Sequence, residues 1–325
     1  MDSDLTRYVD ADATYLVTGG AGFIGSHLVE NLLAGGARVR VLDDFSTGRR
    51  ENLSPFMDRI ELLEGDITNP DTCLEAAEGV KIIFHQAALP SVPRSVADPF
   101  RSHEVNATGT LNVLLAARDA GTRRVVYASS SSAYGDTPTL PKVEGQTPSP
   151  RSPYAVAKLT GEQYCRALPG VYGLEAVALR YFNVFGPRQD PDSPYAAVIP
   201  LFVAAAMAGR SPTINGDGGQ TRDFTYIRNV VLANLLVASV PAERINGEVF
   251  NVGCGERISI NDLWQAIRET LGAEVEATHG PPRAGDVRDS LASLERLKER
   301  TGYEVLVGLD EGIQRTVSWI RAKTA

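Results

Sequence analysis

The chain has 325 residues, of which 43% are hydrophobic and 22% are charged, and its formal net charge at pH 7 is −8. This acidic balance argues against general binding of nucleic acid or of an anionic membrane surface, since both require an excess of basic side chains. No apolar run reaches the roughly 18 residues of a transmembrane helix, and the acidic N-terminal segment lacks the apolar core of a signal peptide. The three cysteines, Cys73, Cys165 and Cys254, are too widely spaced for a disulfide framework or a zinc site. We therefore expect a cytoplasmic protein that binds no metal.

Up to about residue 180, short apolar runs alternate with longer helical patterns. The predicted strands lie at residues 15–18, 39–42, 60–63, 81–85, 124–128 and 176–179, and the predicted helices include residues 26–34, 105–120 and 154–168. Such short runs, rich in valine and isoleucine, are typical of parallel strands that are buried on both faces. Their repeated alternation with helices predicts an α/β fold with a doubly wound parallel sheet, the Rossmann architecture.

The pattern becomes irregular after residue 180, where several prolines and the turn-rich segment 215–220 interrupt it. The alternation returns in part, with helices expected near residues 228–240, 259–271 and 291–300 and a strand at residues 248–252. We expect a larger domain from residues 13–181 plus about 223–252. A smaller C-terminal α/β domain would then comprise residues 182–222 plus about 253–325.

A glycine-rich segment follows the first predicted strand and opens the first predicted helix. Its glycines at positions 19, 22 and 25 would let the backbone approach a dinucleotide pyrophosphate at the positive end of the helix. The next strand ends in Asp43, at the distance expected of a carboxylate that binds the adenosine ribose hydroxyls. Such a carboxylate repels a 2′-phosphate, so the pattern favours NAD over NADP. Asp44 is an alternative or a second ribose ligand.

Two further strand ends carry candidate cofactor residues. Asp66 and Ile67 follow the third strand, where they would lie along the adenine edge, although a helix N-cap explains them equally well. Gln86, Ala87 and Ala88 end the fourth strand, and their small side chains would admit the nicotinamide side of the cofactor.

Tyr154 and Lys158 are four residues apart and so share one face of a predicted helix. A tyrosine hydroxyl has a pKa of about 10 and is a poor base at neutral pH, but a nearby ammonium group would lower that pKa. A run of serines at residues 129–132 follows the fifth strand and could hold a substrate oxygen. Together these residues indicate a site for proton transfer beside the nucleotide.

The glycine segment, the Ser/Tyr/Lys set and residues 180–187 (RYFNVFGP) together resemble the extended short-chain dehydrogenase/reductases that modify nucleotide sugars. Within that group, the chain is most similar to the UDP-N-acetylglucosamine 4-epimerases. The segments that carry this likeness are residues 85–95, 134–136, 188–200 and 214–227.

The resemblance implies a bound NAD that is regenerated in each cycle, a UDP-sugar substrate and a homodimer. In the family, the tyrosine matching Tyr154 takes the proton of the sugar 4-hydroxyl while hydride passes from C4 to NAD. The 4-keto intermediate then turns over and receives hydride on its other face. Lys158 matches the residue that binds the nicotinamide ribose, and Ser130 matches the catalytic serine, with Ser131 as the alternative.

The resemblance also implies two sets of binding residues. The cofactor set is Gly19, Gly22, Phe23, Ile24, Gly25, Asp43, Asp44, Phe45, Ser46, Gly48, Asp66, Ile67, Gln86, Ala87, Ala88, Asn106, Tyr154 and Lys158. The substrate set is Ser91, Arg94, Ser130, Ser131, Tyr154, Asn183, Ala197, Val198, Ile199, Pro200, Thr213, Asn215, Arg222, Arg257, Arg283, Asp286 and Ser290. Arg222 and Arg283 are the expected phosphate ligands, and Arg257 is a weaker third candidate.

Ser290 matches the family position that lies against C2 of the hexose. A bulky tyrosine there restricts the family's 4-epimerases to glucose and galactose, whereas a small serine leaves room for an acetamido group. The resemblance therefore implies that both the N-acetylated and the plain UDP-hexoses are substrates. Ser290 is also a candidate N-cap for the helix expected from about residue 291.

Other reactions of the same group are less consistent with the sequence. The 4,6-dehydratases carry an acidic pair, and the decarboxylases a glutamate, where this chain has Ser131 and Ser132. A 4-epimerase of a UDP-uronate or a dTDP-hexose remains the alternative enzyme. A non-catalytic dinucleotide sensor is the alternative outside catalysis, although such a protein would usually have lost Tyr154 or Lys158.

Overall fold

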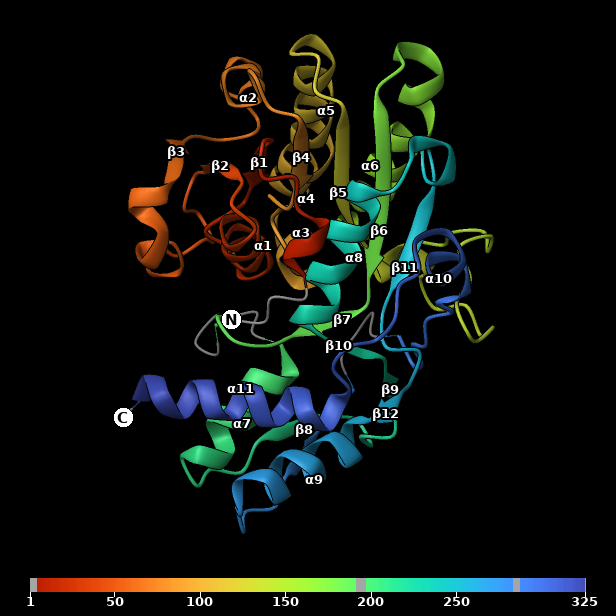
Figure 1. Ribbon diagram of the computed structural model, residues 1–325. Helices are drawn as coiled ribbons and strands as arrows, with labels where there is room; N and C mark the ends of the chain where they lie inside the picture. Colours follow the sequence, from red (N-terminus) through yellow and green to blue (C-terminus); the bar gives the residue numbers. More distant parts are fainter. Residues whose placement is uncertain (1–4, 191–196, 283–286, 325) are drawn as a thin grey trace.

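The computed structural model describes residues 5–190, 197–282 and 287–324. The described residues form a seven-stranded sheet with the order β11-β6-β5-β4-β1-β2-β3, in which each pairing is parallel (Figure 1). The strands are β1 (Thr14–Thr18), β2 (Arg38–Asp43), β3 (Ile60–Glu64), β4 (Ile82–His85), β5 (Arg124–Ser130), β6 (Glu175–Tyr181) and β11 (Val249–Val252). The strand order reverses between β1 and β4, and in such sheets a ligand crevice forms at that point, beyond the carboxyl ends of the strands.

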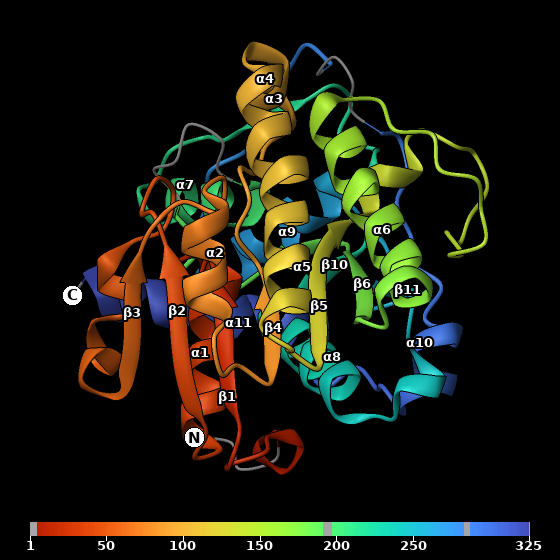
Figure 2. The same ribbon diagram turned by 90° about the horizontal axis from the view of Figure 1, so that it is seen from above.

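Helices cover both faces of the sheet, which confirms the predicted doubly wound architecture. On one face lie α2 (Pro70–Ala77), α5 (Thr110–Asp119) and α6 (Pro153–Tyr172), side by side in Figure 2. On the other face, α1 (Phe23–Ala34) packs against α8 (Ile227–Ser239). The sheet therefore separates two apolar cores, and its central strands are buried on both sides.

The segment between β4 and α5 is more broken than the continuous helix predicted for residues 105–120. It contains α3 (Val92–Ala97), α4 (Pro99–His103) and a π-helical turn at Glu104–Gly109 that leads into α5. Short 3₁₀ helices lie at Thr6–Tyr8, Arg50–Asn52, Ser54–Arg59, Ser131–Tyr134 and Ala242–Arg244.

Beyond β6 the chain builds a second group of elements below the carboxyl edge of the sheet (Figure 1). Three small sheets pair β7 (Asn183–Phe185) with β10 (Phe224–Tyr226), β9 (Thr221–Arg222) with β12 (Ile258–Ser259), and β8 (Thr213–Asn215) with β13 (Thr278–Gly280). The helices here are α7 (Val198–Met207), α9 (Ile260–Leu271) and α11 (Leu309–Thr324), whereas α10 (Glu295–Thr301) packs beside β11 of the main sheet. Between these segments, α8 and β11 return to the main sheet, as the sequence predicts.

The helix expected from about residue 291 begins only at Glu295, and its N-cap is Leu294. Residues 289–293 are instead extended, since Ser290 N donates to Thr221 O (3.1 Å) and Ala292 N donates to the Asp223 carboxylate (3.0 Å). The N-cap interpretation of Ser290 was therefore wrong, because long-range hydrogen bonds hold this segment out of the helix.

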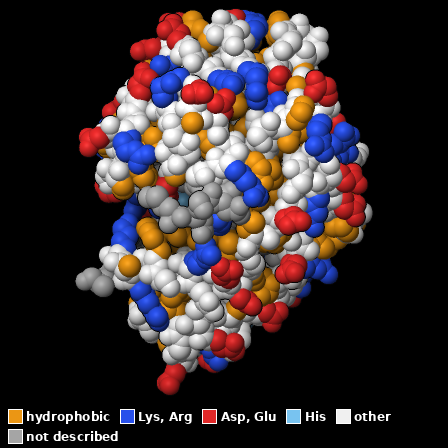
Figure 3. Space-filling view, in the orientation of Figure 1, with side chains coloured by type: hydrophobic (Ala, Val, Ile, Leu, Met, Phe, Trp, Pro, Cys, Tyr) orange, Lys and Arg blue, Asp and Glu red, His pale blue; other side chains and the backbone are white. Residues whose placement is uncertain are grey.

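Among the described helices, none has both the length and the apolar character needed to cross a lipid bilayer. Acidic and basic side chains are interspersed on the face shown in Figure 3, so the negative net charge is not gathered into one patch on that face.

Candidate active site

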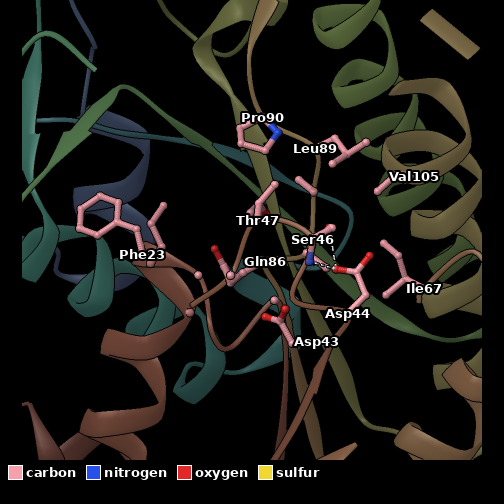
Figure 4. A pocket seen from close by; sticks show the side chains of 18 of the residues that line it. Phe23, Asp43, Asp44, Ser46, Thr47, Ile67, Gln86, Leu89, Pro90 and Val105 are labelled. Carbon is pink, nitrogen blue, oxygen red and sulfur yellow. Dashed lines mark hydrogen bonds between the residues drawn. The ribbon is translucent and has the colours of Figure 1, made fainter. Parts of the chain in front are cut away.

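A cavity of about 620 Å³ lies at the carboxyl ends of the central strands, beside the N-terminus of α1. Figure 4 shows side chains from several strand ends, among them Asp43, Asp44 and Gln86, gathered around it. The predicted cofactor residues that line this cavity are Gly19, Gly22, Phe23, Ile24, Gly25, Asp43, Asp44, Ser46, Gly48, Asp66, Ile67, Gln86, Ala87, Ala88, Tyr154 and Lys158. The structure thus brings together most of the residues that the sequence assigns to NAD.

Two glycines are required for the close packing of the turn that enters α1. Gly19 has φ +69°, and a Cβ on it would lie 2.7 Å from the backbone of Ala87. A Cβ on Gly25 would lie 2.1 Å from the carbonyl oxygen of Gly19. Side chains at these positions would force the N-terminus of α1 away from the strand ends. The turn between β1 and α1 therefore fits a pyrophosphate, which must approach backbone amides closely.

Both candidate ribose ligands are held in place by hydrogen bonds, Asp43 from its own loop and from the turn after β1, and Asp44 from its own loop. Asp43 is 6% exposed, and its two carboxylate oxygens accept hydrogen bonds from Ala21 N and Phe45 N, each at 2.8 Å. Burial raises the pKa of Asp43, and these two amides oppose that rise. The Asp44 carboxylate accepts hydrogen bonds from Ser46 N (2.9 Å) and Ser46 Oγ (2.7 Å). The geometry leaves both aspartates at the cavity.

Two described residues of the predicted cofactor set do not line this cavity. The Phe45 ring lies against the Arg50 guanidinium, with 3.9 Å between the Arg50 Cζ and the ring centroid. Asn106 is buried and bridges the backbone of Leu89, to which its amide oxygen and nitrogen bond at 2.9 and 3.0 Å. Asn106 therefore shapes the loop after β4.

A second cavity of about 330 Å³ adjoins the first, and Ser91 and Tyr154 line both. Seven residues of the predicted substrate set line it, namely Ser91, Ser130, Ser131, Tyr154, Asn183, Arg222 and Ser290. Arg94 and Ala197 line the larger cavity. Tyr154 therefore stands where a nucleotide in one cavity would meet a second ligand in the other.

The remaining predicted substrate residues lie elsewhere or are not described. Ile199 is a core residue in the first turn of α7, next to Val198 and Pro200, and none of the three lines either described cavity. Thr213 and Asn215 lie on β8, and the Arg257 guanidinium is 3.6 Å from the carboxylate of Asp289. None of these three residues lines the described cavities. Arg283 and Asp286 lie outside the described residues.

Sequence reasoning missed three charged residues of the second cavity, Lys142, Arg151 and Asp289. Lys142 is 2% exposed, and its ammonium group bonds both the carbonyl oxygen and the hydroxyl of Thr137. Lys142 and Arg151 belong to the long loop between Tyr134 and α6, which has no apolar periodicity to place its side chains. Only the nearness of Arg151 to Tyr154 in the sequence could have indicated this site.

The reactive side chains come from the end of β5 and the first turns of α6. Ser152 caps α6 by accepting a hydrogen bond from Ala155 N (3.2 Å), which sets Tyr154 in the first turn. Ser130, Ser131 and Tyr154 all line the second cavity, and of the two serines only Ser130 acts on the pKa of Tyr154, which it lowers. Lys158 Nζ lies 6.0 Å from the centroid of the Tyr154 ring.

Burial dominates the protonation of these groups. It raises the pKa of Tyr154 to about 12, and the hydrogen bond with Ser130 opposes that rise. Burial also lowers the pKa of Lys158 to about 7, although the negative charge of Glu162 acts to raise it. The sequence predicts that Lys158 lowers the pKa of Tyr154, but burial of the phenol raises it instead, and Ser130 is the group that opposes the rise. A further positive charge beside Tyr154 would be needed to make it a base at neutral pH.

The model of the NAD dependent epimerase/dehydratase family matches residues 15–253 of the chain. The chain belongs to this family. Its members depend on NAD, in agreement with the cofactor expected from the sequence and with the cavity around the glycine turn.

Individual members of the family resemble the chain over nearly its whole length. UDP-glucose 4-epimerase of Mycolicibacterium smegmatis is 44% identical over 95% of this chain and 99% of its own. The structure of UDP-N-acetylglucosamine 4-epimerase from Methanobrevibacter ruminantium in complex with UDP-N-acetylmuramic acid is 38% identical, with a TM-score of 0.90 over 96% of this chain and 99% of that one. The structure of UDP-glucose 4-epimerase from Thermotoga maritima with UDP-glucose is 37% identical, with a TM-score of 0.91 over 96% and 100% of the two chains.

Proposed function

We propose that this protein is an NAD-dependent 4-epimerase of UDP-hexoses that acts through a transient 4-keto intermediate. The proposed substrates are the pair UDP-GlcNAc and UDP-GalNAc together with the pair UDP-Glc and UDP-Gal. The observation that carries the proposal is the place of Tyr154, which borders both cavities and shares the smaller one with Ser130, with Lys158 one helical turn away.

The cofactor and the protein divide the chemistry between them. Bound NAD would supply the group that accepts a hydride and later returns it, and its nicotinamide would add positive charge near Tyr154. Tyr154 takes the proton of the sugar 4-hydroxyl and gives it back after the keto sugar has turned over. Ser130 holds the same sugar oxygen, and Lys158 binds the nicotinamide ribose.

The larger cavity would hold the cofactor and the smaller one the sugar. Accordingly, we assign residues 13–181 plus about 223–252 to cofactor binding, and residues 182–222 plus about 253–325 to the UDP-sugar. Arg222 lines the sugar cavity, with its Nη1 bonded to the carbonyl oxygens of Thr221 (2.9 Å) and Arg288 (3.2 Å). A guanidinium that borders this cavity has the charge and the planar geometry for bidentate contact with a diphosphate.

The residues at the reaction centre support epimerisation over elimination or decarboxylation. The two residues that follow Ser130 in this cavity are serines, Ser131 and Ser132, and the Asp289 carboxylate that also lines it accepts a hydrogen bond from the Thr221 hydroxyl. Ser132 donates hydrogen bonds to Ser130 Oγ from its backbone (3.2 Å) and from its hydroxyl (2.9 Å). These contacts orient Ser130 and add no acid that could drive loss of water. Oxidation at C4 followed by reduction needs only the groups that are present.

Two further features support a cytoplasmic homodimer. Val96, Phe100 and Val156, on α3, α4 and α6, are exposed apolar side chains, and Phe100 is 89% exposed. Both α3 and α4 pack against α6, so these side chains belong to one region that a second copy of the chain would cover. The three cysteines are free thiols, as is usual in a reducing compartment.

A parallel substrate assay tests the function. Purified protein is given UDP-Glc, UDP-GlcNAc and UDP-glucuronate separately, and the configuration at C4 of each product is determined by NMR. We expect UDP-Gal and UDP-GalNAc to form without added NAD, because the cofactor is retained. Exclusive conversion of UDP-glucuronate, or formation of a 4-keto-6-deoxy sugar, would assign the chain to a different reaction.

A further inference from the structure

Three consecutive residues at the end of β5 pair with three side chains of α6, two through hydrogen bonds and one across the smaller cavity. The hydrogen-bonded pairs are Ala128 O with Lys158 Nζ (2.8 Å) and Ser129 Oγ with Glu162 Oε1, and the third pair is Ser130 with Tyr154, which line the smaller cavity together. The α6 residues follow one another at intervals of four, so they share the face that packs on the sheet. Lys158, Ser130 and Tyr154 belong to the proposed catalytic set. The proposed reaction gives no role to the middle pair, Ser129 and Glu162.

Glu162, in the middle pair, is anchored by a buried cation. Glu162 is 0% exposed, and its carboxylate accepts hydrogen bonds from Arg180 Nε (2.8 Å) and Arg180 Nη2 (2.6 Å). Arg180 is 2% exposed, and its guanidinium lies over the Tyr134 ring, 4.4 Å from the centroid. The Glu162 carboxylate is therefore held by Arg180 on β6 and by Ser129 on β5, and the rotation of its side chain is restricted.

A buried ion pair of this kind contributes little net stability, because removing two charges from water offsets much of their attraction. The ion pair between Glu162 and Arg180 matters more for the position of the neighbouring groups than for stability. Ser129 joins the ion pair to the strand end that carries Ser130, the next residue in the chain. Proton transfer requires heavy atoms within hydrogen-bond reach, so a small shift of Ser130 against Tyr154 changes the rate.

We propose that Glu162 is a positioning residue for the epimerisation: held by Arg180, it fixes Ser129 and thereby sets Ser130 against the hydroxyl of Tyr154. The role rests on the proposed function, because it acts through Tyr154 and Ser130. Neither Glu162 nor Arg180 lines the described cavities, so the effect is transmitted through the end of β5 and not by contact with a ligand.

The first test replaces Ser129 by alanine in the NAD-loaded protein. Ser129→Ala deletes the connecting hydroxyl, while Glu162 keeps both bonds to Arg180 and no buried charge loses its partner. We expect kcat for UDP-Glc to fall about 10-fold, because the serine is no longer set for proton transfer. KM, the Kd of UDP and the NAD content should stay within about twofold of the parent values.

Thr316→Val is the matched control, because it removes a buried hydroxyl on α11 that donates to Gly312 O (2.7 Å), far from β5 in the sequence. Its kcat should match that of the parent protein. An unchanged kcat in Ser129→Ala would overturn the positioning role. A parallel loss of NAD or of UDP affinity would also overturn it, since Ser129 borders the larger cavity and would then be a ligand contact.

A second variant removes the ion pair as a unit. Glu162→Leu combined with Arg180→Met replaces both buried charges by apolar side chains, an exchange that buried pairs often tolerate. We expect the same fall in kcat as in Ser129→Ala, and no further fall when all three changes are combined. Independent, multiplying losses would contradict a shared route. If the parent protein epimerises no UDP-hexose, the proposed function and this role both fail, whereas an active parent with an unaffected Ser129→Ala overturns the role alone.

Discussion

Tyr154 carries the proton-transfer chemistry in the proposed reaction, and its surroundings explain why the phenol is protonated before the ligands bind. Burial raises its pKa to about 12, and the Ser130 hydrogen bond offsets only part of that rise. Tyr154→Phe keeps the ring packing and removes only the hydroxyl. We expect kcat to fall by roughly 10²–10⁴-fold with an unchanged thermal midpoint, as is typical for loss of a general base. Tyr172→Phe, at the far end of α6, is the control. Turnover near the parent level in Tyr154→Phe would exclude this residue from the reaction.

The choice between Asp43 and Asp44 as ribose ligand can be decided by cofactor retention. Asp43→Ala should release NAD during purification and weaken discrimination against NADP, because the carboxylate both accepts ribose hydroxyls and repels a 2′-phosphate. Asp43 also accepts the amides of Ala21 and Phe45, so damage to the loop alone would weaken both cofactors equally. Comparing the Kd of NAD and of NADP in Asp43→Ala and Asp44→Ala separates these effects. Loss of discrimination only in Asp44→Ala would reverse the assignment.

Ser290 borders the sugar cavity from an extended segment, and since it caps no helix, its replacement removes no cap. A tyrosine at this position would occupy space beside the sugar, where an acetamido group needs room. We expect Ser290→Tyr to lower kcat/KM for UDP-GlcNAc much more than for UDP-Glc, because steric exclusion acts only on the larger substrate. The measurement is the ratio of the two kcat/KM values in parent and variant, with Ser290→Ala as the small-residue control. An unchanged ratio would show that this residue does not limit the pocket.

At the scale of elements, the approach of α1 to the strand ends depends on Gly25. In Gly25→Ala the new Cβ would lie 2.1 Å from Gly19 O, so the turn must open and its amides must move. We expect purified Gly25→Ala to contain little NAD, measured by chromatography after denaturation. Gly170→Ala, a helical glycine of α6 whose Cβ would meet open space, should retain NAD and gain stability of about 0.5–1 kcal/mol. Full retention of NAD by Gly25→Ala would show that the turn accommodates the added Cβ without loss of cofactor affinity.

At the scale of the whole molecule, a buried histidine makes stability depend on pH. His85 is 0% exposed between the hydroxyls of Thr18 (2.7 Å) and Thr110 (3.0 Å), and burial, aided by the charge of Lys158, lowers its pKa to about 3. The unfolded chain binds a proton below pH 6.5 that the folded chain does not, so this stability is present above about pH 6.5 and is lost as the pH falls towards 3. The loss is about 2 kcal/mol at pH 5.

We expect the thermal midpoint of the parent protein to drop between pH 7.5 and pH 5, and to drop less in His85→Gln. Asp223 changes the stability in the opposite sense, because burial raises its pKa to about 6, although hydrogen bonds from three backbone amides oppose the rise. This contribution is the same in the parent protein and in His85→Gln. Equal pH dependence in parent and variant would remove His85 as the source of the acid sensitivity.

Local patterns were sufficient for the main sheet and for the nucleotide side of the site. Short valine- and isoleucine-rich runs mark buried parallel strands, and the spacing of glycines after β1 and of Tyr154 and Lys158 on α6 follows from backbone geometry over a few residues. These features depend on neighbours in the chain, so the sequence alone determined the Rossmann fold, the glycine turn at the larger cavity and the tyrosine–lysine pair on α6.

Only the tertiary structure decided which distant residues meet. The Asp223 carboxylate accepts the amide of Ala292, 69 residues away, and this contact keeps Ser290 in an extended segment beside the sugar cavity. Lys142 reaches the same cavity from an irregular loop, and Glu162 pairs with Arg180 across two elements. Local periodicity does not indicate such contacts, because their partners are brought together only when the sheet, its helices and the second group of elements have packed.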